Sequence, residues 1–175
     1  MFAEFYPPQG LLEWVLLCSI ALYALGIVWF LSGTRHRRAC CAVQPFASIV
    51  IAARDEEQRI RSCLLSLLAQ DYPSERFEVI VVDDGSRDDT AHIVEKLCVQ
   101  DARLRLLRRS PGGSKKAALA QAIEQAHGEI ILTTDADCQV GAQWLRGMLA
   151  HFDANVGVVI GFSQIGAPGQ VMSWR

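Results

Sequence analysis

Short apolar runs alternate with helix-like segments through residues 46–162, and this alternation limits the possible folds more than any other feature of the chain. Continuous apolar runs are typical of strands that are covered on both faces. These expected strands are residues 46–53, 77–82, 104–107, 130–133 and 156–162. Helices are expected between them, around residues 60–68, 93–97, 115–126 and 143–152. The pattern predicts an α/β fold in which helices flank a mostly parallel sheet with right-handed crossovers.

Polar clusters follow three of the expected strands. They are Arg-Asp-Glu at 54–56, Asp-Asp-Gly-Ser at 83–86 and Asp-Ala-Asp at 135–137. Ligands of parallel sheets bind beyond the carboxyl ends of the strands, near a topological switch. Asp135 and Asp137 would repel each other unless a divalent cation joined them to an anion, and Mg²⁺ commonly shares carboxylates with substrate phosphates. The three clusters together predict a metal–diphosphate site.

Each feature also has a plainer interpretation when it is taken alone. An ordinary turn accounts for residues 83–86, because Asp-Gly-Ser is common turn chemistry. Lys115 and Lys116 stand at a helix start, where their charge opposes the dipole and suggests an anionic ligand, but a solvated basic pair is the alternative. A D-x-D triplet occurs by chance in many proteins. The prediction of a site depends on the features falling in order along the sheet.

The stretch 14–31 carries no charged side chain and is long enough to cross a membrane, which takes roughly 20 residues as a helix. The basic cluster 35–38 follows it, whereas the charged side chains before it are acidic. The positive-inside rule therefore predicts a single-pass anchor of the cell membrane in residues 1–34, with the N-terminus outside, a basic juxtamembrane linker over 35–45 and the rest in the cytosol. A cleavable signal peptide would carry its positive charge before the apolar stretch, and a buried globular helix would be shorter or striped.

Composition excludes several other classes of protein. The net charge of −2 gives no electrostatic basis for binding nucleic acid. The six cysteines form no C-x-x-C pair and no Cys/His spacing of a zinc site, so reduced thiols facing the cytosol are the simplest interpretation.

Four stretches, taken together, resemble glycosyltransferase family 2 of the GT-A fold. They are residues 48–57, 78–86, 115–123 and 128–137. The resemblance runs from about Pro45 to Phe162 and departs from the family at Asp55 and Ala120, where Asn is frequent. It implies a nucleotide-sugar-binding domain over residues 46–165 and leaves 166–175 as an incomplete C-terminal stretch.

The resemblance implies roles in binding the nucleotide. The loop that contains Ala53, Arg54 and Glu56 would line the pocket of the base. Asp84, with Asp83 beside it, would bind the base itself, often uracil. A UDP-sugar is therefore the expected donor.

The resemblance also implies a metal site. Asp137 would be the direct ligand, and Asp135 would lie nearer the ribose or a metal-bound water, while Lys115 matches a lysine near the nucleotide. The cofactor would be Mg²⁺ or Mn²⁺, which neutralises the leaving diphosphate.

The expected function is a membrane-anchored glycosyltransferase that transfers a sugar from a nucleotide-diphosphate donor to an unknown acceptor, a lipid or a polysaccharide, by metal-assisted inverting displacement. No catalytic residue is assigned, because the general base and the acceptor-binding half of the family are expected beyond Arg175. One alternative is a catalytically incomplete nucleotide-sugar-binding remnant or partner subunit. Another is a sugar nucleotidyltransferase, which needs a Gly-rich basic loop where residues 53–57 are acidic.

Overall fold

The structure is a computed structural model. It describes residues 10–33, 44–110, 112, 114–153 and 155–161. The chain divides into two compact units, residues 1–38 and 39–175. Most of the predicted linker over 35–45, and all of the predicted stretch 166–175, lie outside the described residues.

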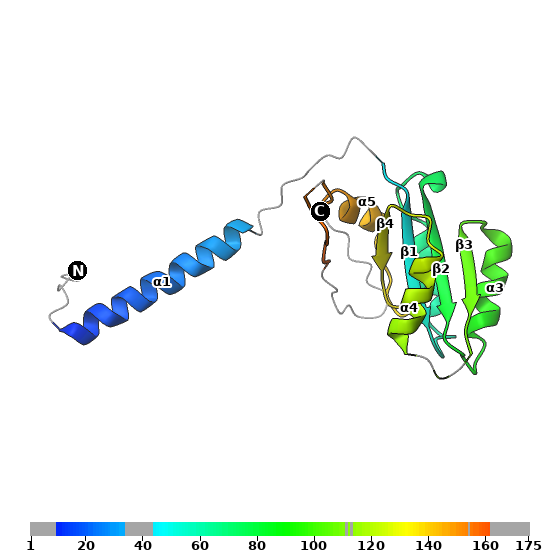
Figure 1. The fold of residues 1–175 in the computed structure, drawn as a ribbon, viewed down its shortest axis with the longest axis horizontal. Helices are drawn as coiled ribbons and strands as arrows, with labels where there is room; N and C mark the ends of the chain where they lie inside the picture. Colours follow the sequence, from blue (N-terminus) through cyan, green and yellow to red (C-terminus); the bar gives the residue numbers. More distant parts are fainter. Residues whose placement is uncertain (1–9, 34–43, 111, 113, 154, 162–175) are drawn as a thin grey trace, which may run out of the picture. The chain divides into compact units, whose positions relative to one another are not determined.

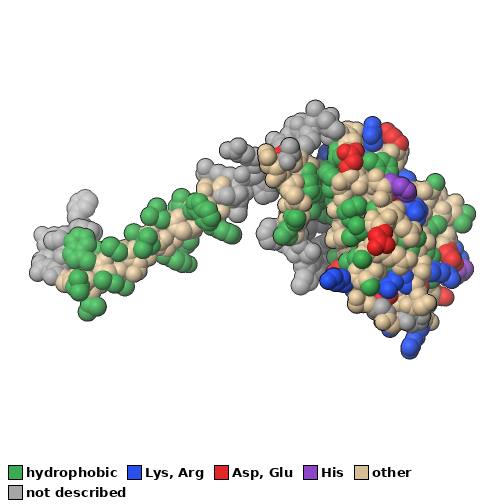
Figure 2. All heavy atoms as spheres, viewed as in Figure 1, with side chains coloured by type: hydrophobic (Ala, Val, Ile, Leu, Met, Phe, Trp, Pro, Cys, Tyr) green, Lys and Arg blue, Asp and Glu red, His purple; other side chains and the backbone are tan. Residues whose placement is uncertain are grey.

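Helix α1, Leu11–Gly33, is 23 residues long and makes up nearly all of the described part of the first unit. Its stretch Leu11–Phe30 has a mean hydropathy of 2.2, and every described side chain of α1 is exposed. Figure 2 shows hydrophobic side chains along the length of the helix. Length and composition alone make α1 able to cross a membrane, and signal sequences share these properties.

The second unit contains a four-stranded sheet whose strands all run parallel, in the order β3-β2-β1-β4 (Figure 1). The strands are β1 (Ala47–Ala53), β2 (Phe77–Asp83), β3 (Leu104–Arg108) and β4 (Ile130–Thr133). Ala47 of β1 stands opposite Phe77 on one side and Ile130 on the other. The central strands β1 and β2 are almost wholly buried, as the continuous apolar runs predicted, so the expected parallel α/β sheet is confirmed.

Helices cover both faces of the sheet. Alternate residues of a strand point to opposite faces, so Ile49 packs toward α2, α3 and α5, whereas Val50 packs toward α4. These helices are α2 (Ile60–Leu68), α3 (Thr90–Gln100), α4 (Lys115–Glu124) and α5 (Trp144–Leu149); a 3₁₀ turn, η1 (Ser74–Arg76), precedes β2. The two apolar layers fix the sheet and therefore the positions of its strand ends.

The strand order places a topological switch beside β1. The chain adds β2 and then β3 on one side of β1, and α4 brings it back to β4 on the other side. The crossover from β1 through α2 to β2 therefore lies on one side of β1, and the crossover through α4 ends at β4 on the other side. A crevice forms where such connections diverge.

The prediction of a last strand over residues 156–162 is wrong for the described part, 156–161, which has no strand. Val158 and Ile160 are 77% and 83% exposed, and a groove of about 1130 Å³ lies between this segment and β4. Val and Ile favour extended backbone, but a strand also needs a hydrogen-bonded neighbour, and 156–161 pairs with none of the described strands. Helix α5 is likewise shorter than the expected helix over 143–152.

Candidate functional site

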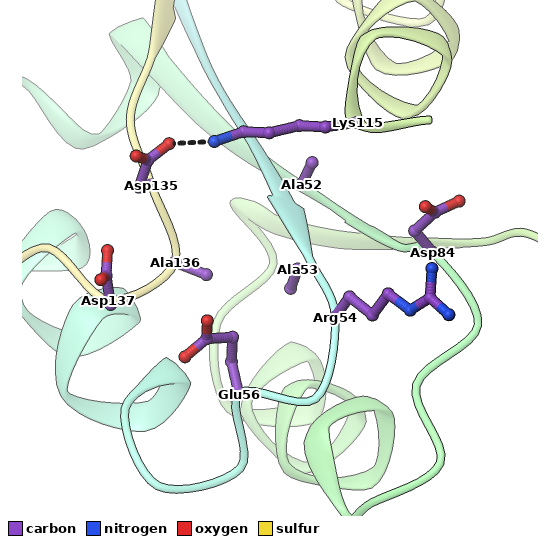
Figure 3. A pocket seen from close by; sticks show the side chains of 9 residues that line it. All are labelled: Ala52, Ala53, Arg54, Glu56, Asp84, Lys115, Asp135, Ala136 and Asp137. Atoms are coloured by element: carbon purple, nitrogen blue, oxygen red, sulfur yellow. Dashed lines mark hydrogen bonds and ion pairs between the residues drawn. The ribbon is translucent and has the colours of Figure 1, made fainter. Parts of the chain in front are cut away.

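A cavity of about 380 Å³ opens at the carboxyl end of the sheet, where the chain leaves the neighbouring strands β1 and β4 (Figure 3). Its lining residues come from the end of β1 and the loop after it, from the loops after β2 and β4, and from the start of α4. They are Ala52, Ala53, Arg54, Glu56, Asp84, Lys115, Asp135, Ala136 and Asp137. The strand ends that carry polar clusters in the sequence thus meet around one cavity.

Seven of the eight residues predicted for the nucleotide and metal sites line this cavity. Figure 3 shows Asp135 and Asp137 on one side of it and Asp84 and Arg54 on the other. The exception is Asp83, which is buried at the end of β2 and is not a lining residue. Its Oδ1 accepts a hydrogen bond from the Ser86 backbone N–H at 3.1 Å, so it closes the turn beneath the site.

The two carboxylates after β4 are exposed and paired with cations. Lys115 Nζ lies 2.5 Å from Asp135 Oδ1, and Arg59 Nη1 lies 3.9 Å from Asp137 Oδ2. The side chains of Asp135 and Asp137 are 59% and 48% exposed. Among the described residues, no group of three or more His, Cys, Asp or Glu side chains is placed to hold a metal. Two exposed carboxylates instead fit an ion that takes its other ligands from water and a diphosphate.

A buried cysteine supports the loop that carries these carboxylates. Cys63 Sγ of α2 donates a weak hydrogen bond to the Asp135 backbone O at 3.6 Å, and the Cys138 backbone N–H donates to the same oxygen at 3.2 Å. Burial, reinforced by the neighbouring acidic groups, raises the pKa of Cys63 to about 12. The thiol therefore stays protonated at neutral pH, and its hydrogen bond positions the loop.

Arg109 is a residue of this site that the sequence analysis missed. Its Nη1 donates to Asp84 Oδ1 at 3.1 Å, and the two side chains are only 20% and 7% exposed. The Arg109 backbone N–H donates to Asp83 O at 2.9 Å, which continues the pairing of β2 with β3. A signal was present, because Arg109 directly follows a strand as the three acidic clusters do.

The sequence profile of Glycosyl transferase family 2 matches residues 48–171, which include every element from β1 to α5. The chain belongs to glycosyl transferase family 2. The fold, with its parallel sheet and flanking helices, is of the GT-A type.

Two curated relatives illustrate the range of similar proteins. A beta-monoglucosyldiacylglycerol synthase of Trichormus variabilis is 36% identical over 135 residues, which are 76% of this chain and 29% of that protein. The poly(ribitol-phosphate) beta-N-acetylglucosaminyltransferase TarS of Staphylococcus aureus is 33% identical over 127 residues, or 70% of this chain and 22% of TarS. The chain thus spans less than a third of the length of either relative.

Two solved structures are similar in fold. The mannosyltransferase PcManGT of Pyrobaculum calidifontis, in complex with GDP-Man and Mn²⁺, has a TM-score of 0.64 at 29% identity. The similarity covers 66% of this chain and 35% of the PcManGT chain. S. aureus TarS 1–349 in complex with UDP-GlcNAc has a TM-score of 0.54 at 34% identity, and the similarity covers 59% of this chain and 30% of the TarS chain. Nucleotide-sugar donors of more than one base thus occur among similar proteins.

Proposed function

We propose that the cavity binds the nucleotide-sugar donor of a glycosyltransferase. The observation that carries the proposal is that Asp84 and Asp137, which follow strands on opposite sides of β1, line one cavity at the topological switch. The base lies toward Asp84, and the diphosphate lies toward Asp135 and Asp137. The loop with Ala53, Arg54 and Glu56 forms the wall between these two ends.

The pair of Arg109 and Asp84 favours uridine as the nucleoside. Arg109 holds Asp84 Oδ1, whereas Oδ2 accepts no hydrogen bond from the described residues, so Oδ2 is the freer oxygen to accept a hydrogen bond from a base. Uracil presents one ring N–H between two carbonyl oxygens, whereas guanine presents adjacent ring and amino N–H donors that together suit both oxygens of a carboxylate. The donor proposed is therefore a UDP-sugar.

Asp137 and Asp135 would hold Mg²⁺ or Mn²⁺, with Asp137 as the direct ligand. The ion, when bound, neutralises charge on the leaving diphosphate during an inverting displacement. The chain itself supplies positive charge near both carboxylates, from Lys115, which lines the cavity beside Asp135, and from Arg59, which is paired with Asp137. Both cations are exposed side chains that can turn from a carboxylate to a phosphate oxygen.

Residues 1–34 form a single-pass anchor in the cell membrane in this proposal, with the N-terminus outside, a basic linker over 35–45 and the donor-binding domain, 46–165, in the cytosol. The support is the 20-residue apolar stretch of α1 and the basic residues that follow it. A lipid or a polysaccharide is the proposed acceptor, since the two curated relatives are named for a diacylglycerol lipid and a poly(ribitol-phosphate).

Calorimetry on the full chain in detergent tests the donor site. UDP-sugar should bind with Mn²⁺ or Mg²⁺ present and bind much more weakly in excess chelator. Asp137→Asn should lower the affinity with metal about tenfold, to the level seen with chelator. Asp71→Asn is the matched control, because Asp71 is a similarly exposed aspartate paired with Arg146 away from the cavity.

Equal affinity with and without chelator would remove the metal from the proposal, and no binding of any nucleotide sugar would remove the donor site. Binding without transfer to any lipid or polysaccharide acceptor would make the chain a donor-binding partner.

A further inference from the structure

Two loops beside the cavity are joined by hydrogen bonds that are not part of the sheet. One loop, residues 54–59, follows β1, and the other, residues 84–89, follows β2. We call the set of five bonds between residues 55–57 and residues 86–90 the loop clasp. The bonds run from Asp55 N to Ser86 Oγ (3.1 Å), Glu56 N to Thr90 Oγ1 (2.8 Å), Glu57 N to Asp88 Oδ2 (3.0 Å), Arg87 N to Asp55 Oδ1 (2.7 Å) and Asp89 N to Glu57 Oε2 (3.2 Å).

Thr90 and Asp88 form the centre of the clasp. Thr90 is fully buried, and its hydroxyl donates to Asp88 Oδ1 at 2.5 Å. A hydroxyl has one proton, so this bond leaves its lone pairs to accept from the Glu56 N–H. The other oxygen of Asp88 accepts from the Glu57 N–H. Burial opposes the charged form of Asp88, but the hydrogen bonds from Thr90 and Glu57 outweigh it and lower its pKa.

The backbone that the clasp holds has an unusual conformation at Asp55. This residue has φ +55°, in the left-handed region that few side chains other than Asn and Asp adopt without cost. Asp55 uses both its N–H and its carboxylate in the clasp. The contacts therefore hold residue 55 in a conformation that turns the chain between Arg54 and Glu56, which both line the cavity.

We infer that Thr90 and Asp88 are positioning residues of the donor pocket, which fix the backbone of residues 55–57 so that its wall stands ready before a ligand arrives. The inference rests on the proposed function and adds two residues that do not line the cavity. A wall that is already ordered does not have to lose conformational entropy when the nucleotide binds. The clasp thus contributes to affinity without touching the ligand.

The variant Thr90→Val tests this, because it removes the hydroxyl and keeps the shape of the side chain. Backbone amides 55–57 of the free protein should exchange faster with solvent, and the Kd for UDP with Mn²⁺ should rise about tenfold, as expected for a lost buried hydrogen bond. Thr90→Ser restores the hydroxyl and should return both the exchange and the Kd to within about twofold of the wild type.

Asp101→Asn is the matched control. Asp101 also has a lowered pKa, because hydrogen bonds from Arg103 favour its charged form, but it lies between α3 and β3 and does not line the cavity. This variant should lower the free energy of unfolding and leave both the Kd and the exchange of 55–57 unchanged. Asp88→Asn gives a second test of the clasp if Thr90→Val does not fold.

An unchanged Kd in a folded Thr90→Val protein with faster exchange at 55–57 would overturn the inference. So would an Asp101→Asn variant that weakens UDP binding as much as Thr90→Val does. Amide exchange is measured without nucleotide, so failure of the wild type to bind UDP would reject the proposed function while the clasp is still tested.

Discussion

Two acidic residues, one near each end of strand β2, are each paired with an arginine. At the amino end, Glu78 meets Arg105 at 3.1 Å, and at the carboxyl end Asp84 meets Arg109 at the same distance. Both carboxylates are buried, with 8% and 7% of their side chains exposed. At each end of the sheet, therefore, a buried carboxylate is paired with one arginine.

The rest of their surroundings differs. Both oxygens of Glu78 are used, because Oε2 accepts from Arg105 and Oε1 accepts from Ser48 Oγ at 2.7 Å and from the His127 N–H at 2.8 Å. Asp84 Oδ2 accepts no hydrogen bond from the residues that the structure describes, and Asp84 lines the cavity. A saturated buried acid stabilises the fold, whereas one with a free oxygen is able to bind a ligand. The comparison separates the end of the sheet whose buried acid is satisfied within the fold from the end at which we propose that the donor binds.

Removing Glu78 should have the largest effect on stability. Glu78→Ala leaves Arg105, Ser48 and the His127 N–H without their buried partner and should lower the free energy of unfolding by about 3 kcal/mol. UDP affinity of the folded protein should not change. Urea unfolding and calorimetry measure the two quantities, with the exposed Glu75→Ala as control. A loss of affinity would break the separation of the two ends.

Removing Arg109 should change binding more than stability. Arg109→Gln removes the guanidinium group that holds Asp84 Oδ1. The carboxylate is then no longer fixed for uracil, so the affinity for UDP should fall about tenfold. Both of its oxygens become available to guanine, so the preference for UDP over GDP should narrow. Competition binding with the two nucleotides measures this preference. Arg108→Gln is the control, because Arg108 is exposed and pairs with Glu95 away from the cavity. An unchanged preference would show that the Arg109 pair is structural, like that of Glu78.

The smallest effect is a dependence of stability on pH at the amino end. Burial opposes the charged form of Glu78, but hydrogen bonds from His127, Ser48 and Arg105 outweigh it and lower its pKa below the ordinary 4.5. A lowered folded-state pKa stabilises the protein above the unfolded-state pKa, so this contribution should be present above pH 4.5 and lost as the pH falls through the folded-state value. Unfolding curves of the wild type and of Glu78→Gln, recorded about every pH unit between pH 6 and 3, measure this pH-dependent difference in stability. If the stability of the wild type depended on pH no more than that of the variant, the hydrogen bonds to Glu78 would not stabilise its charged form.

The sequence predicts the sheet and the cavity well, for a physical reason. Continuous apolar runs such as 46–53 and 77–82 can be satisfied only between two layers, and parallel strands bring the polar residues after them to one edge. This logic places Asp84, Lys115 and Asp137 around one cavity without a structure.

Prediction from the sequence fails where the partner of a residue depends on packing between distant segments. Glu78 reads as one polar residue in a buried strand, and its partner His127 is 49 residues away. Thr90 follows two aspartates in the sequence, and nothing in that order indicates that its hydroxyl accepts a hydrogen bond from the Glu56 N–H of another loop. The segment 156–161 has the composition of a strand but lacks a paired neighbour among the described strands.

The order of the strands has a consequence for synthesis on the ribosome. Chains emerge from the N-terminus, so β1, β2 and β3 can assemble, and Asp84 can meet Arg109, while β4 is still being made. Until then β1 is an open border of the nascent sheet. The arrival of β4 closes that border and in the same event delivers Asp135 and Asp137, so the end of the cavity that we propose binds the diphosphate forms last.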